Sequence, residues 1–246
     1  MLFRSCEPVL IETTAETRFA ITGDMLRAVH AKKKLAGILI ASPANPTGTM
    51  MTPQALADLI NVSEELGVKF ISDEIYHGLD YAMPAETAAR ISENVVVINS
   101  FSKYFCMTGW RIGWIVAPEP LVRPIDRLQG NLSISVPTLS QIAATAAFDG
   151  RAEMDAVKHG YEENRRILLD GLPRIGFDEF LPVDGAFYLY ADVSKFTDDS
   201  FDFASRMLQE AGVATTPGID FDPHHGRQRL RFSYARSADD MREAVD

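Results

Sequence analysis

The chain has 246 residues, 46% of them hydrophobic and 24% charged, and its formal net charge is −10. These fractions indicate a globular protein with a substantial core and exclude a disordered or fibrous chain. The excess of acidic residues argues against a nucleic-acid partner or an anionic membrane surface. Since no stretch approaches the ~20 apolar residues of a membrane helix, a membrane partner is not expected either.

The thiols and histidines indicate neither a disulfide framework nor a metal site. Cys6 and Cys106 are the two cysteines, and they lack the spacing of a CxxC or Cys/His motif. This usage favours reduced thiols in a cytoplasmic protein. The five histidines form no metal-binding pattern, so no metal ion is expected.

Short apolar runs alternate with helical patterns in the first half of the chain, which predicts βαβ units and a mostly parallel sheet. Thr52 and Pro53 predict the start of a helix, as N-cap and first helical residue, and Gly67 predicts its end. The predicted strands of this half are Pro8–Ile11, Gly37–Ala41, Lys69–Ser72, Val95–Ile98 and Gly113–Ala117.

The second half opens with a helical pattern from Glu119 to Leu172, whose last part, Arg151–Leu172, predicts a long helix between two domains. Beyond it, Ala186–Ala191 and Arg229–Tyr234 alternate in the manner of strands, with a helix expected over Ser200–Ala211. That order indicates a second, smaller unit of mixed strands and helices.

We therefore predict an α/β fold with two domains. Residues 1–165 would form part of a large domain, a mostly parallel sheet with helices on both faces, and residues 166–246 a smaller α+β domain. In open sheets of this kind, ligands bind at the carboxyl ends of the strands. Polar motifs follow three predicted strands at that end, namely Asn45–Gly48, Asp73–Tyr76 and Ser100–Lys103.

Lys103 has the most informative setting of any residue. It lies just past an apolar strand, is bracketed by hydroxyl side chains, and is followed by Arg111. A lysine considered alone is usually a solvated surface charge. In this setting, however, its amine can be desolvated beside an anionic cofactor, which is what a Schiff-base lysine requires.

Five motifs, taken together, closely resemble those of the class I/II aminotransferases, which are pyridoxal-phosphate enzymes of fold type I. The resemblance implies pyridoxal 5'-phosphate as cofactor and an amino acid and a 2-oxo acid as substrates. It also implies a homodimer, because a second subunit completes the active site in this family. The motifs are Asn45–Gly48, Asp73–Tyr76, Ser100–Lys103, Gly109–Gly113 and Leu230–Ser233.

The resemblance assigns the catalytic roles to Lys103, Asp73 and Tyr76. Lys103 would bond covalently to the cofactor and move the substrate proton. Asp73 would keep the pyridine nitrogen protonated, so that the ring accepts electrons from the substrate Cα. Tyr76 and Asn45 would form hydrogen bonds with the phenolic oxygen of the cofactor. Without the resemblance, Asp73 could simply cap a turn, Tyr76 could be a half-buried aromatic, and Asn45 could be a turn residue.

The remaining assignments concern anions. Ser100, Ser102 and Arg111 match phosphate ligands, because hydroxyls and a guanidinium suit a dianion. Arg231, with Asn45 beside the substrate, matches the arginine that binds the α-carboxylate. Three arginines, at positions 227, 229 and 231, would share one strand face, and Arg229 is the alternative if the register differs. A structural ion pair or a solvated face would be the plainer interpretations.

The preferred function is amino-group transfer between an amino acid and a 2-oxo acid. A C–S lyase of the same fold is the alternative enzyme, because these motifs fix the cofactor and the α-carboxylate rather than the outcome at Cβ. A truncated, catalytically incompetent fragment is the alternative of another class. The motifs match only the middle and end of a family member, so we hypothesise that the N-terminal portion and the end of the last helix are missing. The sequence does not indicate which amino acid is the donor.

Overall fold

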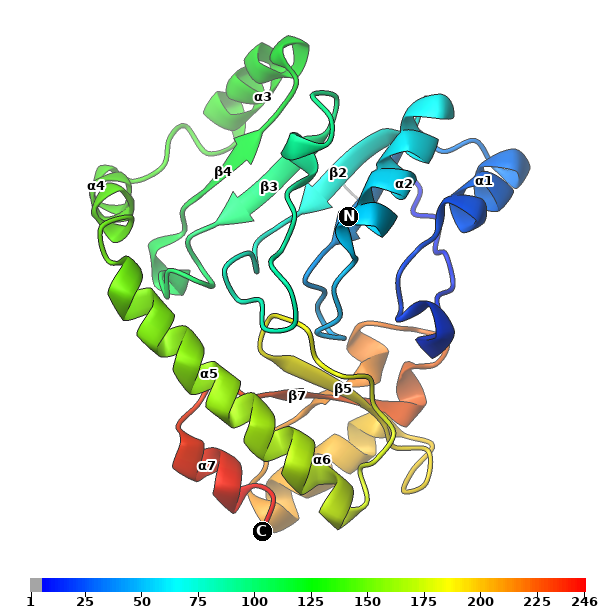
Figure 1. The fold of residues 1–246 in the computed structure, drawn as a ribbon, viewed down its shortest axis with the longest axis vertical. Coiled ribbons are helices and arrows are strands. Elements are labelled where there is room, and N and C mark those ends of the chain that lie inside the picture. Colours follow the sequence, from blue (N-terminus) through cyan, green and yellow to red (C-terminus); the bar gives the residue numbers. More distant parts are fainter. Residues whose placement is uncertain (1–5) are drawn as a thin grey trace.

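The computed structural model describes residues 6–246 and contains two β-sheets. The larger sheet has the strand order β1-β2-β3-β4 and the smaller one the order β5-β7-β6. In Figure 1 the larger sheet lies above the smaller one, and helix α5 begins near the lower end of the larger sheet and runs down beside the smaller one. No helix in the described part of the chain has the length and apolar character needed to cross a membrane.

The larger sheet brings the polar motifs to one edge. Strands β1, β2 and β3 are parallel, whereas β4 is antiparallel to β3, with Ser100 opposite Gly113. The carboxyl ends of three strands therefore meet the amino end of the fourth at a single edge. The strands are β1 (Gly37–Ala41), β2 (Lys69–Asp73), β3 (Val96–Ser100) and β4 (Gly113–Val116).

Helices α1 (Gly23–Lys32) and α2 (Pro53–Glu65) pack against one face of this sheet. The Thr52 hydroxyl accepts a hydrogen bond from the Ala55 N–H at 3.2 Å, and Gly67 has a φ of +68° just beyond the helix. The predicted cap, first-turn proline and terminating glycine of α2 are thus confirmed. The shared core consists of Leu26, Ile38, Met51, Leu56, Leu59, Ile60, Val68, Phe70, Ala88, Val95 and Val97.

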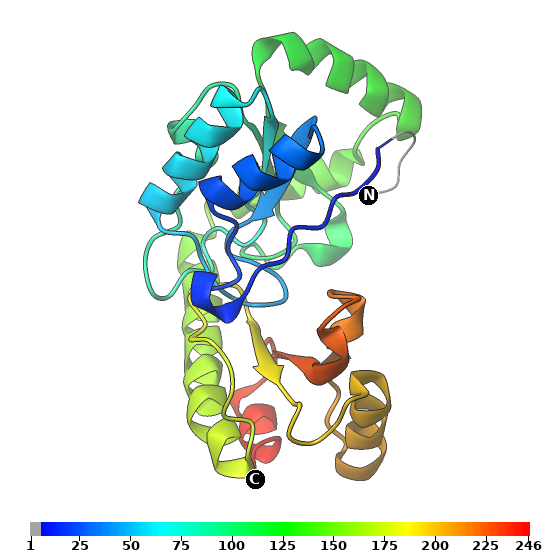
Figure 2. The same cartoon turned by 90° about the vertical axis from the view of Figure 1, so that its right-hand side faces the viewer.

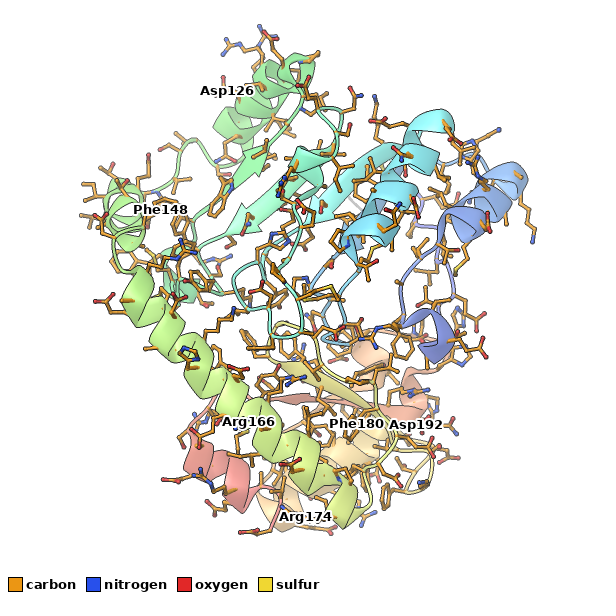
Figure 3. The ribbon with its side chains drawn as sticks, viewed as in Figure 1. Asp126, Phe148, Arg166, Arg174, Phe180 and Asp192 are labelled. Carbon is orange, nitrogen blue, oxygen red and sulfur yellow. The ribbon has the colours of Figure 1, made fainter. Side chains whose placement is uncertain are left out.

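Three helices follow β4 in the region predicted to be helical: α3 (Glu119–Leu132), α4 (Thr138–Ala147) and α5 (Arg151–Gly171). Phe148, labelled in Figure 3, lies at the end of α4, where the chain turns into α5. Its ring packs edge-on against Phe101, at 5.4 Å between ring centroids. This contact ties α4 to the loop that carries Lys103.

The smaller sheet is antiparallel and is built from β5 (Tyr188–Asp192), β6 (Thr216–Pro217) and β7 (Arg229–Ser233). Helices α6 (Ser200–Ala211) and α7 (Ala238–Glu243) complete this part. The observed bounds of α6 match the prediction. The core of this part comprises Leu168, Leu172, Phe177, Val183, Leu189, Ala191, Val193, Ala204, Leu230, Phe232, Tyr234, Met241 and Val245.

Short 3-10 helices form most of the remaining regular structure. They occur in connections, where a single tight turn redirects the chain between longer elements. They are η1 (Ala15–Thr17), η2 (Ala88–Arg90), η3 (Thr108–Trp110), η4 (Leu172–Ile175), η5 (Gly218–Asp220) and η6 (Gly226–Gln228).

Two predictions about strands are wrong. Pro8–Ile11 is extended but forms no strand, because nothing in the described part of the chain pairs with its backbone. Figure 2 shows this segment running outside the sheet without an arrow. Arg227 lies in η6 rather than on a strand, so only Arg229 and Arg231 belong to β7. A turn stabilised by Asp222 precedes η6, and the strand begins only after η6, at Arg229.

Candidate active site

Lys103 follows β3 and lies in the joint between the two sheets. Its amine is 5.6 Å from the centre of the Tyr76 ring and 5.7 Å from that of Phe187. The described residues provide no carboxylate as an ion-pair partner for this amine. Aromatic faces attract a cation but do not bind it tightly, so the amine is left available for chemistry.

Asp73 is the last residue of β2 and faces the same edge. Its Oδ1 accepts a hydrogen bond from the Ile75 N–H at 3.3 Å. Burial raises the pKa of the Asp73 carboxyl above its usual range, the bond from Ile75 opposes that shift, and the charge of Glu74 adds to it. A partly buried carboxylate of this kind is stabilised by a cation placed beside it.

Tyr76 belongs to the turn after β2 and is almost fully buried, with 3% of its surface exposed. Its hydroxyl donates to the Tyr188 hydroxyl at 3.1 Å. Burial, followed by that hydrogen bond, raises the pKa of Tyr76 well above its ordinary value. The phenol therefore remains protonated at neutral pH and can act as a hydrogen-bond donor.

Asn45 lies in a tight loop after β1. The loop is closed by two backbone hydrogen bonds, from Ala44 N–H to Thr49 at 2.9 Å and from Gly48 N–H to Ala44 at 2.8 Å. Gly48 has a φ of +66°, and a Cβ there would lie 2.4 Å from the Tyr188 carbonyl oxygen. Only glycine fits at that position, so the loop packs closely against β5 and holds Asn45 beside the smaller sheet.

Arg231 reaches Asn45 from β7. Its Nη1 donates to Asn45 Oδ1 at 2.9 Å and its Nη2 to the Thr216 hydroxyl at 3.0 Å. Its Nε is buried and has no hydrogen-bond partner in the structure. The guanidinium is thus held by neutral oxygens alone, which leaves its charge uncompensated and suited to an anionic ligand.

The other two arginines of this segment have carboxylate partners. Arg229 lies 3.1 Å from Asp192, and Arg227 lies 3.0 Å from Asp199. These ion pairs distinguish Arg227 and Arg229 from Arg231, which the alternation in the sequence does not. The difference favours Arg231 over Arg229 as the residue available to a carboxylate.

The predicted phosphate ligands form a second group around the end of β3. The Ser100 hydroxyl lies 3.0 Å from the Ser102 hydroxyl, and the Ser102 carbonyl accepts a bond from Thr108 at 2.6 Å. Arg111 has a φ of +52°, is exposed, and donates to the Thr108 carbonyl at 2.8 Å. Arg111 forms no ion pair with any described carboxylate, so this group also offers an unpaired cation.

Together these contacts form a connected series from Lys103 to Asn45. The amine lies over the Tyr76 ring, and the Tyr76 hydroxyl is hydrogen-bonded to Tyr188. The Tyr188 ring in turn stacks on Arg231, which is hydrogen-bonded to Asn45. Ser100, Ser102 and Arg111 flank Lys103 closely in the sequence. The site thus offers two guanidinium groups that can each bind an anion, and an amine with no carboxylate partner among the described residues.

Sequence reasoning missed Tyr188, Glu74 and His77. Glu74 is 2% exposed, and its carboxylate accepts bonds from the Ser72 hydroxyl at 2.9 Å and the Ala88 N–H at 2.8 Å. His77 bridges the two loops, with Nε2 3.1 Å from the Ser42 carbonyl and Nδ1 3.4 Å from Glu74. The position of His77 directly after the Asp73–Tyr76 motif was the signal available in the sequence.

Comparison with known proteins identifies the relatives of the chain. The family described as aminotransferase class I and II matches residues 3–246. A valine–pyruvate aminotransferase of Mycobacterium tuberculosis is 48% identical over 98% of this chain and 62% of its own length. The chain thus spans less than two thirds of this relative.

Solved structures agree with this result. An aminotransferase from Mycobacterium tuberculosis superposes with a TM-score of 0.91 at 48% identity, over 95% of this chain and 61% of the other. The aspartate aminotransferase of Thermus thermophilus with maleate superposes with a TM-score of 0.88 at 31% identity, over 96% and 62% of the two chains.

Proposed function

Because the chain belongs to the class I and II aminotransferase family, we propose that it carries the catalytic centre of an enzyme that moves an amino group between an amino acid and a 2-oxo acid. The cofactor of this family is pyridoxal phosphate. The observation that carries the proposal is the amine of Lys103 over the Tyr76 ring, together with two guanidinium groups, those of Arg111 and Arg231, that have no carboxylate partner among the described residues. A cofactor phosphate and a substrate carboxylate are the two anions that such an arrangement requires.

The residues present fit pyridoxal phosphate. Arg111 and the hydroxyls of Ser100 and Ser102 would hold the phosphate, since a guanidinium and hydroxyl donors both suit a dianion. The absence of a carboxylate partner for Arg111 among the described residues supports this role. Asp73 would lie at the pyridine nitrogen, where a positive charge offsets the cost of its burial.

Bound pyridoxal phosphate supplies an electron sink for the pair released at the substrate Cα. Lys103 would hold the cofactor covalently and then carry a proton from the substrate Cα to the cofactor carbon. Tyr76, which stays protonated, would donate to the phenolic oxygen. Asp73 would keep the ring nitrogen charged, which makes the sink effective.

Arg231 would bind the α-carboxylate of the substrate, with Asn45 holding one side of its guanidinium. A bidentate pair of this kind fixes both position and orientation. Valine and pyruvate are the first substrates to test, because the relative from Mycobacterium tuberculosis carries them in its name. The side-chain preference of this chain is otherwise open.

The test is amino transfer by the purified chain supplied with pyridoxal phosphate, L-valine and pyruvate. The proposal predicts alanine and the 2-oxo acid of valine in equal amounts, and no product from Lys103→Ala. Omitting pyruvate should limit product to one equivalent per site. Continuous release of pyruvate and sulfide from cysteine without an acceptor would instead indicate a C–S lyase, and no turnover by a folded chain would contradict the proposal.

We also propose that the protein acts as a cytoplasmic homodimer. The proposal rests on the family and on two exposed free cysteines, Cys6 and Cys106, which are typical of a reducing compartment. Light scattering of the purified chain tests the dimer directly. A mass of 27.2 kDa in solution would be that of a single chain and would contradict it.

A further inference from the structure

Tyr188, the first residue of β5, contacts two residues of the proposed site, Tyr76 and Arg231. Its hydroxyl lies 3.1 Å from the Tyr76 hydroxyl, and its ring centre lies 4.2 Å from Cζ of Arg231. The residue is 6% exposed, so both contacts are shielded from water. No other described side chain touches both Tyr76 and Arg231 in this way.

Each of these two contacts constrains its partner. Among the described residues, Tyr188 is the one hydrogen-bond partner of the Tyr76 hydroxyl. Two rings contact the Arg231 guanidinium, with the centre of the Tyr188 ring 4.2 Å and that of the Phe221 ring 4.8 Å from Cζ. Stacking fixes the plane of a guanidinium, and hence the direction of its N–H groups.

The backbone of Tyr188 is itself fixed. Tyr188 pairs with Ser233 across the smaller sheet, and its carbonyl oxygen closely approaches Gly48 of the Asn45 loop. The ring also packs edge-on against Tyr76, at 5.7 Å between centroids. Because these contacts fix Tyr188, its side chain can in turn fix the positions of Tyr76 and Arg231.

We propose that Tyr188 is a positioning residue that aligns the Tyr76 hydroxyl with the cofactor and the Arg231 guanidinium with the substrate carboxylate. This inference rests on the proposed function, since it assigns no chemistry to Tyr188 itself. In the structure Tyr76 donates its single hydroxyl proton to Tyr188. With cofactor bound, the Tyr188 hydroxyl would instead donate to the Tyr76 oxygen, which leaves the Tyr76 proton for the phenolic oxygen of the cofactor. The Tyr188 ring would hold the Arg231 guanidinium in the orientation that binds the substrate carboxylate.

Two substitutions separate the hydroxyl from the ring. Tyr188→Phe removes the hydroxyl and keeps the ring over Arg231, whereas Tyr188→Leu removes both. Tyr190→Phe is the matched control, because Tyr190 lies on the same strand and its buried hydroxyl has no hydrogen-bond partner in the structure. Thermal unfolding checks that each variant retains its fold.

In the cofactor-loaded protein, two readouts should respond separately. Tyr188→Phe should raise the pH midpoint of the bound cofactor's absorption change by about half a unit, the shift expected for part of one hydrogen bond. Its half-saturation for pyruvate should stay within about twofold of the unmodified chain. Tyr188→Leu should raise that half-saturation by about fivefold, through loss of the stacked ring. Tyr190→Phe should change neither.

A double-mutant cycle in the cofactor-free chain tests the hydroxyl contact alone. Tyr76→Phe and Tyr188→Phe should be coupled by about fivefold in the unfolding equilibrium constant, as expected for one buried hydrogen bond. Tyr76→Phe and Tyr190→Phe should show no coupling. This cycle needs no cofactor, so it still decides the inference if the unmodified chain fails to bind pyridoxal phosphate and the proposed function falls.

Four results would overturn the assignment. One is the absence of coupling between positions 76 and 188. The second is an unchanged absorption midpoint in folded Tyr188→Phe, and the third is an unchanged half-saturation for pyruvate in folded Tyr188→Leu. An equal response from Tyr190→Phe would assign the effects to general loss of a buried phenol and would also overturn it.

Discussion

The two ends of the proposed site are built on regions that differ in packing. The substrate end, with Arg231, belongs to the smaller sheet, where Leu230 and Tyr234 are completely buried. The phosphate end consists of Ser100 at the end of β3 and Arg111, which lies between η3 and β4. Helix α3, which follows β4, has no buried residue, and Leu132 at its end is 66% exposed.

The exposed apolar residues continue onto the sheet itself. Ile115 of β4 is 49% exposed and Val116 is 48% exposed, although both lie in a regular strand. Apolar area left in water contributes nothing to stability. The residue proposed to bind the substrate carboxylate thus lies on a well-packed framework, whereas the residues proposed to bind the cofactor phosphate lie next to a weakly covered one. We therefore expect cofactor binding, rather than carboxylate recognition, to be the weaker property of the chain.

The largest expected effect tests the packing difference. Leu230→Ala should lower the free energy of unfolding by about 3 kcal/mol, because a fully buried leucine leaves both lost burial and a cavity. Leu128→Ala on α3, where the side chain is 59% exposed, should cost about 0.5 kcal/mol or less. Urea unfolding measures both. Equal losses would remove the contrast.

The next effect concerns the well-packed end. Arg231→Lys should raise the half-saturation for pyruvate by about 30-fold, because lysine cannot replace a bidentate, stacked guanidinium. Arg227→Lys is the control, since Arg227 is exposed and pairs with Asp199; it should stay within about twofold. If the control lost as much as Arg231→Lys, the assignment of the carboxylate to Arg231 would be wrong.

A smaller effect is expected at the weakly covered end. Arg111→Lys should weaken pyridoxal phosphate binding by about tenfold, since one charge-assisted contact is lost in part. Inorganic phosphate should compete with the cofactor less effectively in this variant than in the unmodified chain. Arg123→Lys on α3, where Arg123 pairs with Asp126 at 2.7 Å, should bind as the unmodified chain does. Equilibrium dialysis supplies these affinities.

The smallest effect is a pH dependence at Asp73. Burial raises the pKa of this carboxyl in the folded chain, so the folded state holds its proton more tightly than the unfolded state does. Stability from this group is therefore present at acid pH and falls as pH rises through the folded pKa. Asp73→Asn should make the cofactor-free chain slightly more stable at neutral pH, with no difference at acid pH. A variant that is less stable at neutral pH would contradict the sign.

Much of this fold could be predicted because local signals agreed with one another. Thr52, Pro53 and Gly67 mark the ends of α2, and α6 has the predicted bounds, since caps and periodicity are local properties. Pro8–Ile11 failed because a strand also needs a partner, which no local pattern reports. The predicted domain boundary at residue 165 falls inside the continuous helix α5 and remains a prediction.

The sequence could propose site residues where a motif carries the chemistry, as at Lys103 and Asp73, and these assignments stay predictions. The contacts that join the parts of the site could not be predicted, because they cross between the two sheets. Tyr188 reads as an ordinary strand residue, and only the structure brings it to Tyr76 and Arg231. The carboxylate partners of Arg227 and Arg229 were likewise invisible in the sequence.

The most direct test of the central claim is the covalent attachment of the cofactor. The chain is mixed with pyridoxal phosphate, reduced with borohydride, digested and mapped by peptide mass. We predict one modified site, at Lys103, that disappears in Lys103→Ala while that variant remains folded. An unmodified Lys103 in a folded chain at saturating cofactor, or label spread evenly over other lysines, would contradict the claim.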